Sequence, residues 1–402
     1  MKANGLKYVI LVGDGMGDEP IAALDGKTPL EAAKTPAMDA LASQGQLYRL
    51  RTVPPGYPPG SDVANLSLLG YRPEECYSGR APLEAASMGV SLPEGATAFR
   101  CNLVTLERQG EAVRMVDYSA GHITTEEAGE LIAFLQQELG NDLCRLHPGV
   151  SYRHLLVFRG HCEGLVTVPP HDHTGQEVTA YWQRYQPYPA LMTLMEQASR
   201  LLADHPVNVK RRAAGKNPAN GIWLWGEGKS PSMVTLKEQY GITGALISAV
   251  DLLRGIGVCA GMEIIRVPGA TGYLDTNYSG KAAAAIEALD RHDLVFVHVE
   301  APDEAAHQGE LQLKLQAIED FDQKIVKPIS DGLTARGISF RLAVTMDHFT
   351  PLAIRTHSEP PVPLFVYDSR TIASGAPYGE KNAAAAPLLA TGRDFMNLLL
   401  ER

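Results

Sequence analysis

The 402-residue sequence predicts an α/β fold, a doubly wound, mainly parallel sheet with a smaller α/β domain inserted into it. Three observations predict this fold. Short apolar runs alternate with segments of helical periodicity in the first and last parts of the chain. These runs show no alternation of apolar and polar residues, which is typical of strands that are buried on both faces of a sheet. The middle of the chain is richer in aromatic residues and histidine, and the total length exceeds what one core usually holds.

The larger domain is predicted from its apolar runs and the helices between them. KYVILVGDG is expected to form the first strand, and TPAMDALASQGQ a helix that a glycine stops. DLVFVHVE, ISFRLAVTMDH and VPLFVYDS are expected to form further strands. GITGALISAVDLLRGIGV has a helical pattern, and the alanine run at 282–285 suits a helix interior. We expect Pro387, after a second alanine run, to start a helix.

The smaller domain is expected to span residues 91–230, inserted between 1–90 and 231–402 of the larger one. It contains the segments ATAFRCNLVTLE, EAVRMVDYSA and YRHLLVFRG, and turn clusters such as GKNPANG. We expect it to be a second α/β domain that binds the substrate.

The overall composition excludes several classes of protein. A formal net charge of -10 and a pI of about 5.7 leave no basic face for a nucleic acid. No apolar run reaches the roughly 18 residues of a membrane helix, and no signal-peptide cleavage pattern follows the N-terminal run. Five scattered cysteines without a CxxC pair indicate reduced thiols and a cytoplasmic protein. The sequence gives no indication of the oligomeric state.

Polar side chains follow three of the predicted strands, at the point where each strand ends. They are Asp14, Asp303 and His307, and Asp347 and His348, with His357 in the next loop. In open α/β sheets the site lies beyond the carboxyl ends of the strands. Asp303 and His307 are four residues apart, so they share one face of a helix. Each feature alone could be a solvated helix residue, a polar strand end or a turn residue, but together they predict a metal site.

A candidate nucleophile lies in the segment PPGSDVANLSLLGY. Ser61 follows a Pro/Gly loop and opens a segment with helical spacing. A helix N-terminus offers free N–H groups and the positive end of the helix dipole. These suit a phosphate group and a serine oxygen that bears negative charge. The alternative is an ordinary serine at the N-cap of a helix.

These motifs resemble a known family. DGMGDEP with KTPLEAAKTPAMDALA, PGSDVANLSLLGY, APDEAAHQG, MDH and RTHSEPPVPLFV are together similar to cofactor-independent phosphoglycerate mutases of the archaeal type, in the alkaline phosphatase superfamily. The resemblance runs from about residue 7 to about residue 400. It implies an alkaline-phosphatase-like fold. It also implies an isomerase of glycolysis and gluconeogenesis that interconverts 3-phosphoglycerate and 2-phosphoglycerate through a phosphoserine.

The resemblance also implies a site for two divalent cations. Asp14, Ser61, Asp347 and His348 match the ligands of one cation, and Asp303, His307 and His357 match those of the other. A mixed oxygen and nitrogen shell favours Mn²⁺, with Mg²⁺ or Zn²⁺ as alternatives. Two cations would hold the attacking and leaving oxygens of an in-line transfer. Ser61 would take the phosphoryl group and return it to the 2-hydroxyl of re-oriented glycerate, with water excluded.

The second domain offers residues that could hold this small phosphorylated hydroxy acid. VDYSAGHITTEEA resembles the family's substrate loop and contains His122. The other candidates are cationic or imidazole side chains: Arg80, Arg153, His154, His171, Arg211 and, from the larger domain, Lys281. Arginine can bind a carboxylate or a phosphate through two hydrogen bonds. For each of them an ordinary surface position is the alternative.

Other functions are compatible with the same ligands. The resemblance extends to a bacterial branch of the family proposed to act as a homoserine kinase, although the sequence has no P-loop and no kinase signature. A two-metal phosphatase or phosphodiesterase would let water take the phosphate. A non-catalytic binding protein would be expected to lose Ser61 or a metal ligand, and the sequence keeps them all.

Overall fold

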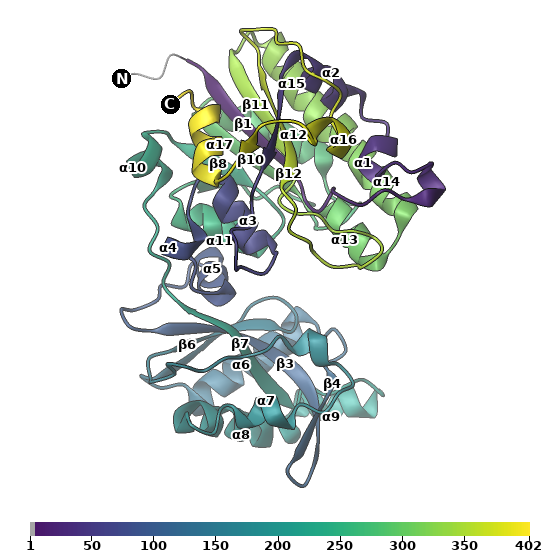
Figure 1. Ribbon diagram of the computed structural model, residues 1–402. Helices are drawn as coiled ribbons and strands as arrows, with labels where there is room; N and C mark the ends of the chain where they lie inside the picture. Colours follow the sequence, from purple (N-terminus) through teal and green to yellow (C-terminus); the bar gives the residue numbers. More distant parts are fainter. Residues whose placement is uncertain (1–4) are drawn as a thin grey trace. The chain divides into compact units, whose positions relative to one another are not determined.

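The computed structural model describes residues 5–402, which form two compact units (Figure 1). Unit 1 contains the chain up to Tyr77 and again from Ser232, and unit 2 contains Ser78–Pro231. The sequence analysis placed the first boundary after residue 90. In the structure it falls earlier, because helix α5 (Arg80–Ser87) packs on strands β3 (Thr97–Gln109) and β7 (Gly221–Lys229) of unit 2.

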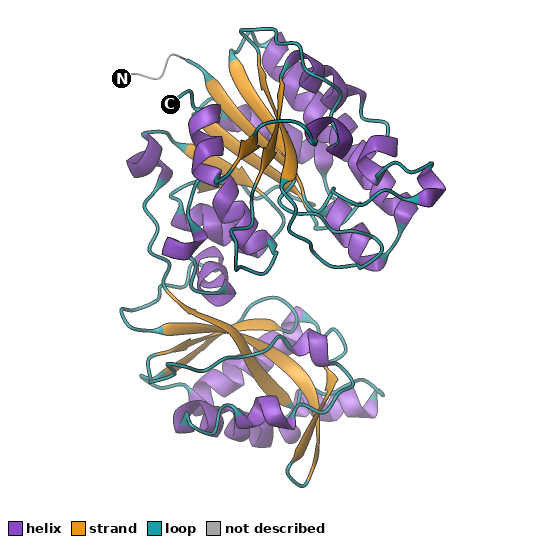
Figure 2. Cartoon of the chain, viewed as in Figure 1, coloured by secondary structure: helices purple, strands orange, loops and turns teal. Residues whose placement is uncertain are grey.

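Unit 1 is built on an eight-stranded sheet. Its strands are β1 (Lys7–Gly13), β2 (Gln46–Leu50), β8 (Gly244–Ile247), β9 (Glu263–Ile264), β10 (Leu294–Val299), β11 (Phe340–Thr345), β12 (Val362–Asp368) and β13 (Leu388–Leu389). Their order is β13-β2-β12-β11-β1-β10-β8-β9. Among the strands of residues 5–402 in this sheet, β12 alone is antiparallel to its neighbours, β11 and β2. Figure 2 shows helices on both faces of the sheet, so the predicted α/β fold with a mainly parallel sheet is confirmed.

Short and medium helices connect these strands. They are η1 (Ala22–Leu24), α1 (Pro29–Ala32), α2 (Pro36–Gln44), α3 (Ser61–Leu68), α4 (Pro73–Cys76), α10 (Leu236–Tyr240), α11 (Asp251–Cys259), α12 (Tyr278–Ala288), α13 (Ala301–Gln308), α14 (Leu311–Phe321), the π-helical turn η3 (Asp322–Val326), α15 (Lys327–Ala335), α16 (Glu380–Ala383) and α17 (Gly392–Leu399). Helix α2 ends at Gly45, as its sequence predicts. Among the described residues, no helix is both long and apolar enough to cross a membrane.

Two local predictions were wrong. GITGALISAVDLLRGIGV was expected to be one helix, but its first part is strand β8 and only its second part is helix α11. All four residues of β8 are buried, and the strand pairs with β10. A fully buried strand shows no alternation of apolar and polar residues, so its sequence cannot be distinguished from that of a buried helix. Pro387 precedes strand β13 rather than a helix, and α17 begins after Thr391, whose side chain forms a capping box with Asp394.

Unit 2 is built on an antiparallel sheet of five strands, β3, β4 (Ala112–Asp117), β5 (Cys144–His147), β6 (Arg153–Phe158) and β7. Its helices, besides α5, are α6 (Thr125–Leu139), η2 (Pro170–His173), α7 (Thr179–Gln183), α8 (Pro189–Ala203) and α9 (Pro206–Ala213). Alternate residues of β6 pack into two separate hydrophobic cores. Leu156 packs with α6 and α8, whereas Leu155 packs with α5. The two faces of this sheet are therefore covered by different helices.

The carboxyl ends of three strands of unit 1 meet at one edge of its sheet. Gly13, the last residue of β1, pairs with Val299, the last residue of β10. On the other side of β1, Val12 pairs with Thr345, the last residue of β11. The residues that follow these strands are therefore neighbours, although they are hundreds of positions apart in the sequence.

Candidate metal centre

The edge formed by β1, β10 and β11 carries the polar residues that the sequence predicted. Asp14 follows β1 directly, and its backbone N–H donates to the carbonyl of Val299, 2.9 Å away. Asp347 and His348 follow β11 and are fully buried. Asp303 and His307 lie on α13, one turn apart, with 3.1 Å between Asp303 Oδ2 and His307 Nε2. The structure thus brings the three predicted strand ends together.

The donor atoms form two overlapping groups. In one, ligand atoms of Asp14, Asp347 and His348 all lie within 4.8 Å of one another. In the other, the same is true of Asp303, His348 and His357. His307 joins the second group through its Nε2, which is 3.0 Å from Nε2 of His357. His348 belongs to both groups, and its ring stacks on that of His357 with 3.9 Å between centroids.

Ser61 is the first residue of helix α3, and its Oγ lies 3.1 Å from Nε2 of His348. The N-cap position is occupied by Gly60, and no side chain caps this helix end. Ser61 is therefore not the N-cap residue of this helix, which was the alternative to a nucleophile. Its hydroxyl faces the two groups of donors, at a helix end where free N–H groups favour negative charge.

The three imidazoles are oriented in the same way. Nδ1 of His307 lies 2.9 Å from the carbonyl oxygen of Arg355, and Nδ1 of His357 lies 3.4 Å from that of Pro59. Nδ1 of His348 lies 3.2 Å from Oγ1 of Thr350. An imidazole whose Nδ1–H donates to an oxygen presents the lone pair of Nε2. All three Nε2 atoms thus face the carboxylates, which is the arrangement of imidazole ligands to a cation.

The carboxylates of this site differ in the direction of their pKa shifts. Burial, together with the charges of Asp347 and Asp303, raises the pKa of Asp14 well above its ordinary value. Burial would also raise the pKa of Asp303, but the imidazoles of His307 and His357 hold it well below its usual range. Asp303 in turn raises the pKa of His307 to about 9. A carboxylate of this cluster is therefore ionised most readily where a positive group lies beside it.

Two buried side-chain oxygens at the site, Oδ1 of Asp14 and Oδ1 of Asn65, accept no hydrogen bond within residues 5–402. Asp14 is only 2% exposed. Buried acceptors are normally satisfied, and carboxylate oxygen with imidazole nitrogen is a donor set that suits divalent cations such as Mn²⁺, Zn²⁺ or Mg²⁺. The residues at this edge therefore fit divalent metal ions.

Several residues that support the donors were missed by the sequence analysis. Oδ2 of Asp14 is 2.9 Å from Nε2 of His298, a histidine inside the apolar strand β10. Asn65, one helical turn after Ser61, donates to Oδ2 of Asp347 at 3.0 Å. Thr350 donates to Oδ1 of Asp303. A polar residue within an apolar run, as at His298, is the signal that could have revealed such a partner.

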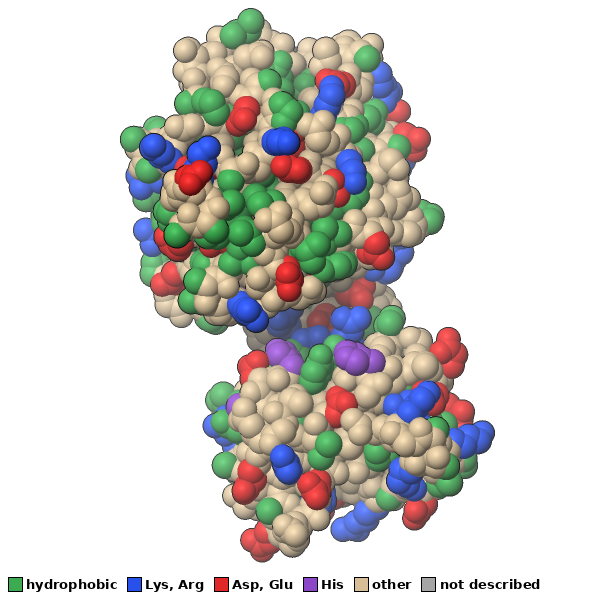
Figure 3. Space-filling view, turned by 90° about the vertical axis from the view of Figure 1, so that its right-hand side faces the viewer, with side chains coloured by type: hydrophobic (Ala, Val, Ile, Leu, Met, Phe, Trp, Pro, Cys, Tyr) green, Lys and Arg blue, Asp and Glu red, His purple; other side chains and the backbone are tan. Residues whose placement is uncertain are grey.

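Part of the predicted substrate set gathers on one exposed face of unit 2. His122, Arg153 and His171 are exposed there, around the rings of Tyr118 and Tyr152. Figure 3 shows histidine side chains close together on the surface of unit 2. Arg80, on α5, is half-buried. Burial lowers the pKa of His171, and the charges of Arg100 and Arg80 lower it further.

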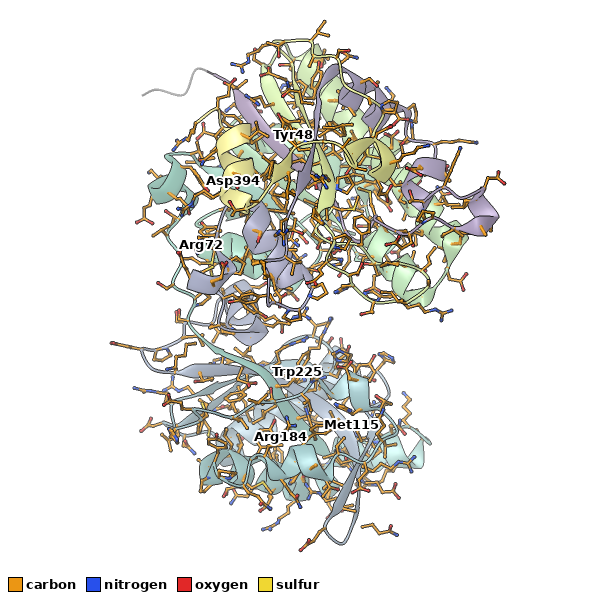
Figure 4. The ribbon with its side chains drawn as sticks, in the orientation of Figure 1. Tyr48, Arg72, Met115, Arg184, Trp225 and Asp394 are labelled. Atoms are coloured by element: carbon orange, nitrogen blue, oxygen red, sulfur yellow. The ribbon has the colours of Figure 1, made fainter. Side chains whose placement is uncertain are left out.

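The same face contains two residues that were not predicted. The guanidinium of Arg100 stacks over the ring of Trp225 at 3.9 Å and pairs with Glu84 at 2.9 Å. Trp225 lies on β7 (Figure 4), and its Nε1 donates to Oδ1 of Asn102 at 3.0 Å. Trp225 also contacts His171, with 5.4 Å between ring centroids. Arg100 lies inside a strand with apolar neighbours, so its position on this face depended on the strand register.

Three predicted substrate residues have positions that do not support this role. His154 is 2% exposed, lies on the α6 side of the sheet, and accepts at Nδ1 from the backbone of Gly149; burial lowers its pKa to about 3. Lys281 is 1% exposed and donates to the carbonyl of His298 at 3.1 Å. Arg211 is 3% exposed and makes its hydrogen bonds within unit 2. The polar atoms of these three side chains therefore make internal contacts.

Solved structures similar to this chain share its fold. A protein from Pyrococcus horikoshii aligns with a TM-score of 0.83 at 30% identity, over 98% of this chain and 97% of that one. A cofactor-independent phosphoglycerate mutase from Thermoplasma acidophilum aligns with a TM-score of 0.67 at 26% identity, over 98% and 99% of the two chains. The mainly parallel sheet, with its carboxylate, imidazole and hydroxyl donors at one edge, defines the class of α/β proteins whose candidate metal centre lies at the carboxyl ends of the strands.

Sequence comparison identifies the family within this class. A family model described as 2,3-bisphosphoglycerate-independent phosphoglycerate mutase matches residues 42–208. A protein of that name from Methanosarcina acetivorans is 54% identical over 364 residues, 90% of each chain. A relative from Geobacter sulfurreducens is 52% identical over 400 residues, covering 99% of this chain and 100% of its own length. The chain belongs to the 2,3-bisphosphoglycerate-independent phosphoglycerate mutase family, which is a family of isomerases.

Proposed function

We propose that this chain interconverts 3-phosphoglycerate and 2-phosphoglycerate through a phosphoserine at Ser61. The observation that carries this proposal is the position of Ser61 Oγ, 3.1 Å from His348 Nε2 at the N-terminus of α3, beside a cluster of carboxylates and imidazoles. The names of the relatives agree with it.

The reaction needs two transfers of the same phosphoryl group. In the first, Ser61 Oγ loses its proton and attacks phosphorus, the bond from phosphorus to the 3-oxygen breaks, and that oxygen takes a proton. Glycerate then re-orients without leaving. In the second transfer its 2-hydroxyl loses a proton and attacks the phosphoserine, and Ser61 Oγ is protonated again. Water must be excluded between the two steps, because it would hydrolyse the phosphoserine.

The donor set supports two divalent cations, for which we propose Asp14, Ser61, Asp347 and His348 on one side and Asp303, His307 and His357 on the other. Bound cations would supply positive charge that favours the serine alkoxide and gathers the phosphate oxygens. Mixed carboxylate and imidazole ligands favour Mn²⁺ over Mg²⁺. His298, Asn65 and Thr350 hold the ligands in place through the hydrogen bonds described above.

Unit 2 is proposed to bind the anionic substrate, a small phosphorylated hydroxy acid. Its surface carries the exposed imidazoles of His122 and His171 and the guanidinium of Arg153. Arginine and imidazole donors suit the phosphate and carboxylate of phosphoglycerate. With this substrate the enzyme would serve glycolysis and gluconeogenesis in the cytoplasm.

Product analysis tests this proposal. The purified chain, loaded with Mn²⁺, is incubated with 3-phosphoglycerate, and 2-phosphoglycerate and free phosphate are measured together. We expect 2-phosphoglycerate without release of phosphate. Release of phosphate alone would identify a phosphatase instead. In a parallel reaction with homoserine and ATP, formation of O-phosphohomoserine without any mutase product would overturn the proposed substrate.

A further inference from the structure

Unit 2 contains three consecutive residues in the left-handed region of backbone conformation, between β4 and α6. Ala120, Gly121 and His122 have φ values of 49°, 67° and 48°. Glycine adopts this conformation readily, but the Cβ of alanine or histidine makes it unfavourable. Strain of this kind persists only where the surrounding contacts fix the backbone, and it is concentrated at functional sites. The contacts that fix this turn are therefore informative.

The carboxylate of Asp117 is the first of these contacts. Its Oδ1 accepts hydrogen bonds from the backbone N (2.8 Å) and Oγ (2.7 Å) of Ser119. Its Oδ2 accepts from the backbone N of Gly121 and from Nδ2 of Asn217, both at 2.8 Å. Burial alone would raise the pKa of Asp117, but these hydrogen bonds lower it below its ordinary value. An ionised carboxylate thus fixes the turn at two backbone positions.

The guanidinium of Arg211 is the second contact. Nη2 donates to the carbonyl of Ala120 and Nη1 to Oε2 of Glu127, each at 2.5 Å. Nε donates to the carbonyl of Asn217 at 2.9 Å. Arg211 therefore ties the left-handed turn to the start of α6 and to the segment that carries Asn217. This accounts for a buried arginine that was predicted to bind substrate.

The residue at the end of the turn is His122. Its backbone N donates to Oγ of Ser119 at 3.1 Å, while its side chain is exposed. The ring lies at the edges of Tyr118 and Tyr152, with centroids 6.3 Å and 6.1 Å away. Within residues 5–402 the imidazole makes these ring contacts and no hydrogen bond. Both of its nitrogens are thus left for a ligand.

The start of helix α6 does not account for the left-handed conformation of this turn. The turn precedes helix α6, but that helix is capped independently by Thr124, whose side chain forms a capping box with Glu127. The backbone of Ile123 is held separately, by Oγ of Ser151 at 2.6 Å. The left-handed conformation of residues 120–122 is therefore not needed to start α6. Its specific consequence is the orientation of the His122 side chain.

We propose that Asp117, Arg211 and Asn217 are positioning residues that hold the imidazole of His122 in the orientation that binds the anionic phosphoglycerate. This inference rests on the proposed function, because it takes His122 as a substrate contact. The three residues do not touch the substrate themselves. They act by fixing the backbone of residues 119–122, so that the ring is already oriented when the substrate arrives.

A double-mutant cycle on the full-length, metal-loaded chain tests this inference. Asp117→Asn and Asn217→Ala each remove hydrogen bonds from the turn, and we expect each to lower kcat/KM for 3-phosphoglycerate by about 10-fold to 100-fold. In a His122→Ala background, the same two changes should have no further effect, because their role passes through the imidazole. The control is Asp142→Asn, an exposed carboxylate of unit 2, which should leave kcat/KM unchanged. An equal loss with and without His122 would overturn the proposal.

A second readout does not depend on turnover. In the wild-type chain, the imidazole resonances of His122, assigned by comparison with His122→Ala, should shift when 3-phosphoglycerate is added. In Asn217→Ala they should lie at different positions and respond less to the same addition. Unchanged resonances with an unchanged response would contradict the proposal. Absence of 2-phosphoglycerate formation by the wild type would instead count against the proposed function, while the resonances would still report on the turn. Should Asp117→Asn fail to fold, Asn217→Ala carries both tests.

Discussion

Lys314 and Asp18 form a buried ion pair in unit 1, with 2.8 Å between Nζ and Oδ2. Lys314 is fully buried and Asp18 is 3% exposed. Nζ also donates to the carbonyls of Gly17 at 3.0 Å and Thr350 at 2.9 Å. The segment after β1, which carries Asp14, is thereby joined to the segment after β11, which carries Asp347 and His348. One lysine from helix α14 thus connects the two segments that carry these candidate metal ligands.

Replacement of this lysine should destabilise the protein and weaken metal binding. Lys314→Met removes the three hydrogen bonds and leaves the carboxylate of Asp18 buried without its cation. Breaking one side of a buried pair costs about 3–5 kcal/mol. Loss of the support behind the ligands should also reduce Mn²⁺ affinity by about 10-fold to 100-fold. Denaturant unfolding and a metal titration measure the two effects.

The matched controls use a surface pair and a double variant. Lys327 forms an exposed pair with Asp331, so Lys327→Met should change the free energy of unfolding little. Asp18→Asn combined with Lys314→Met removes the unpaired charge and should be more stable than Lys314→Met alone. If the double variant were less stable than the wild type by the sum of the two single effects, the loss of stability in Lys314→Met would not originate in the ion pair.

Replacement of the nucleophile should abolish transfer and leave the fold intact. Ser61→Ala removes the Oγ that lies 3.1 Å from His348, and the side chain makes no cap to helix α3. We expect no 2-phosphoglycerate and no labelled protein after acid quench with ³²P-labelled substrate, with an unchanged circular dichroism spectrum. Ser279→Ala, on the exposed face of α12, is the control and should retain full activity. Full activity of Ser61→Ala would exclude the phosphoserine pathway.

Removal of one imidazole should remove one cation. His307 joins the second donor group through contacts with Asp303 and His357, and it is not part of the group that contains Asp14. His307→Ala should therefore lower the metal content by about one ion per chain, because the other donor group is untouched. Elemental analysis after dialysis against Mn²⁺ measures this. His161→Ala, an exposed histidine of unit 2, should bind as many ions as the wild type. Equal metal content in His307→Ala would contradict the two-site assignment.

The sequence predicted the candidate metal ligands that the structure brings together, but not the residues that contact them. Asp14, Asp347 and His348 could be found because strands that end at one sheet edge place their next residues together. Lys314 lies in LQLKLQAIEDF, where an isolated lysine suggests a surface position, and only the folded chain shows which carbonyls it meets. Arg211 was predicted to bind the substrate because of its charge, but its guanidinium donates to the backbone of the left-handed turn at residues 120–122. Such long-range partners have no signal in local sequence patterns.

Glu380 should make the stability of unit 1 depend on pH. Its carboxylate accepts from Oγ1 of Thr28 at 2.7 Å and from the backbone N of Asp18 at 3.4 Å, and burial raises its pKa to about 7 from an ordinary value of 4.5. Because the pKa is raised in the folded state, the folded chain binds a proton more tightly than the unfolded chain. The contribution to stability is therefore complete below about pH 4.5 and is lost as the pH rises through about 7.

Glu380→Gln removes this titration and keeps an acceptor for Thr28. Relative to the wild type, the variant should gain stability progressively between about pH 5 and about pH 8, and the difference should level off above that range. Urea unfolding midpoints of both proteins across this range measure the difference. Glu94→Gln, at an exposed position of unit 2, serves as the control and should follow the wild-type curve. A constant difference between Glu380→Gln and the wild type at every pH would show that the carboxyl group does not titrate in this range, and that the change acts through packing alone.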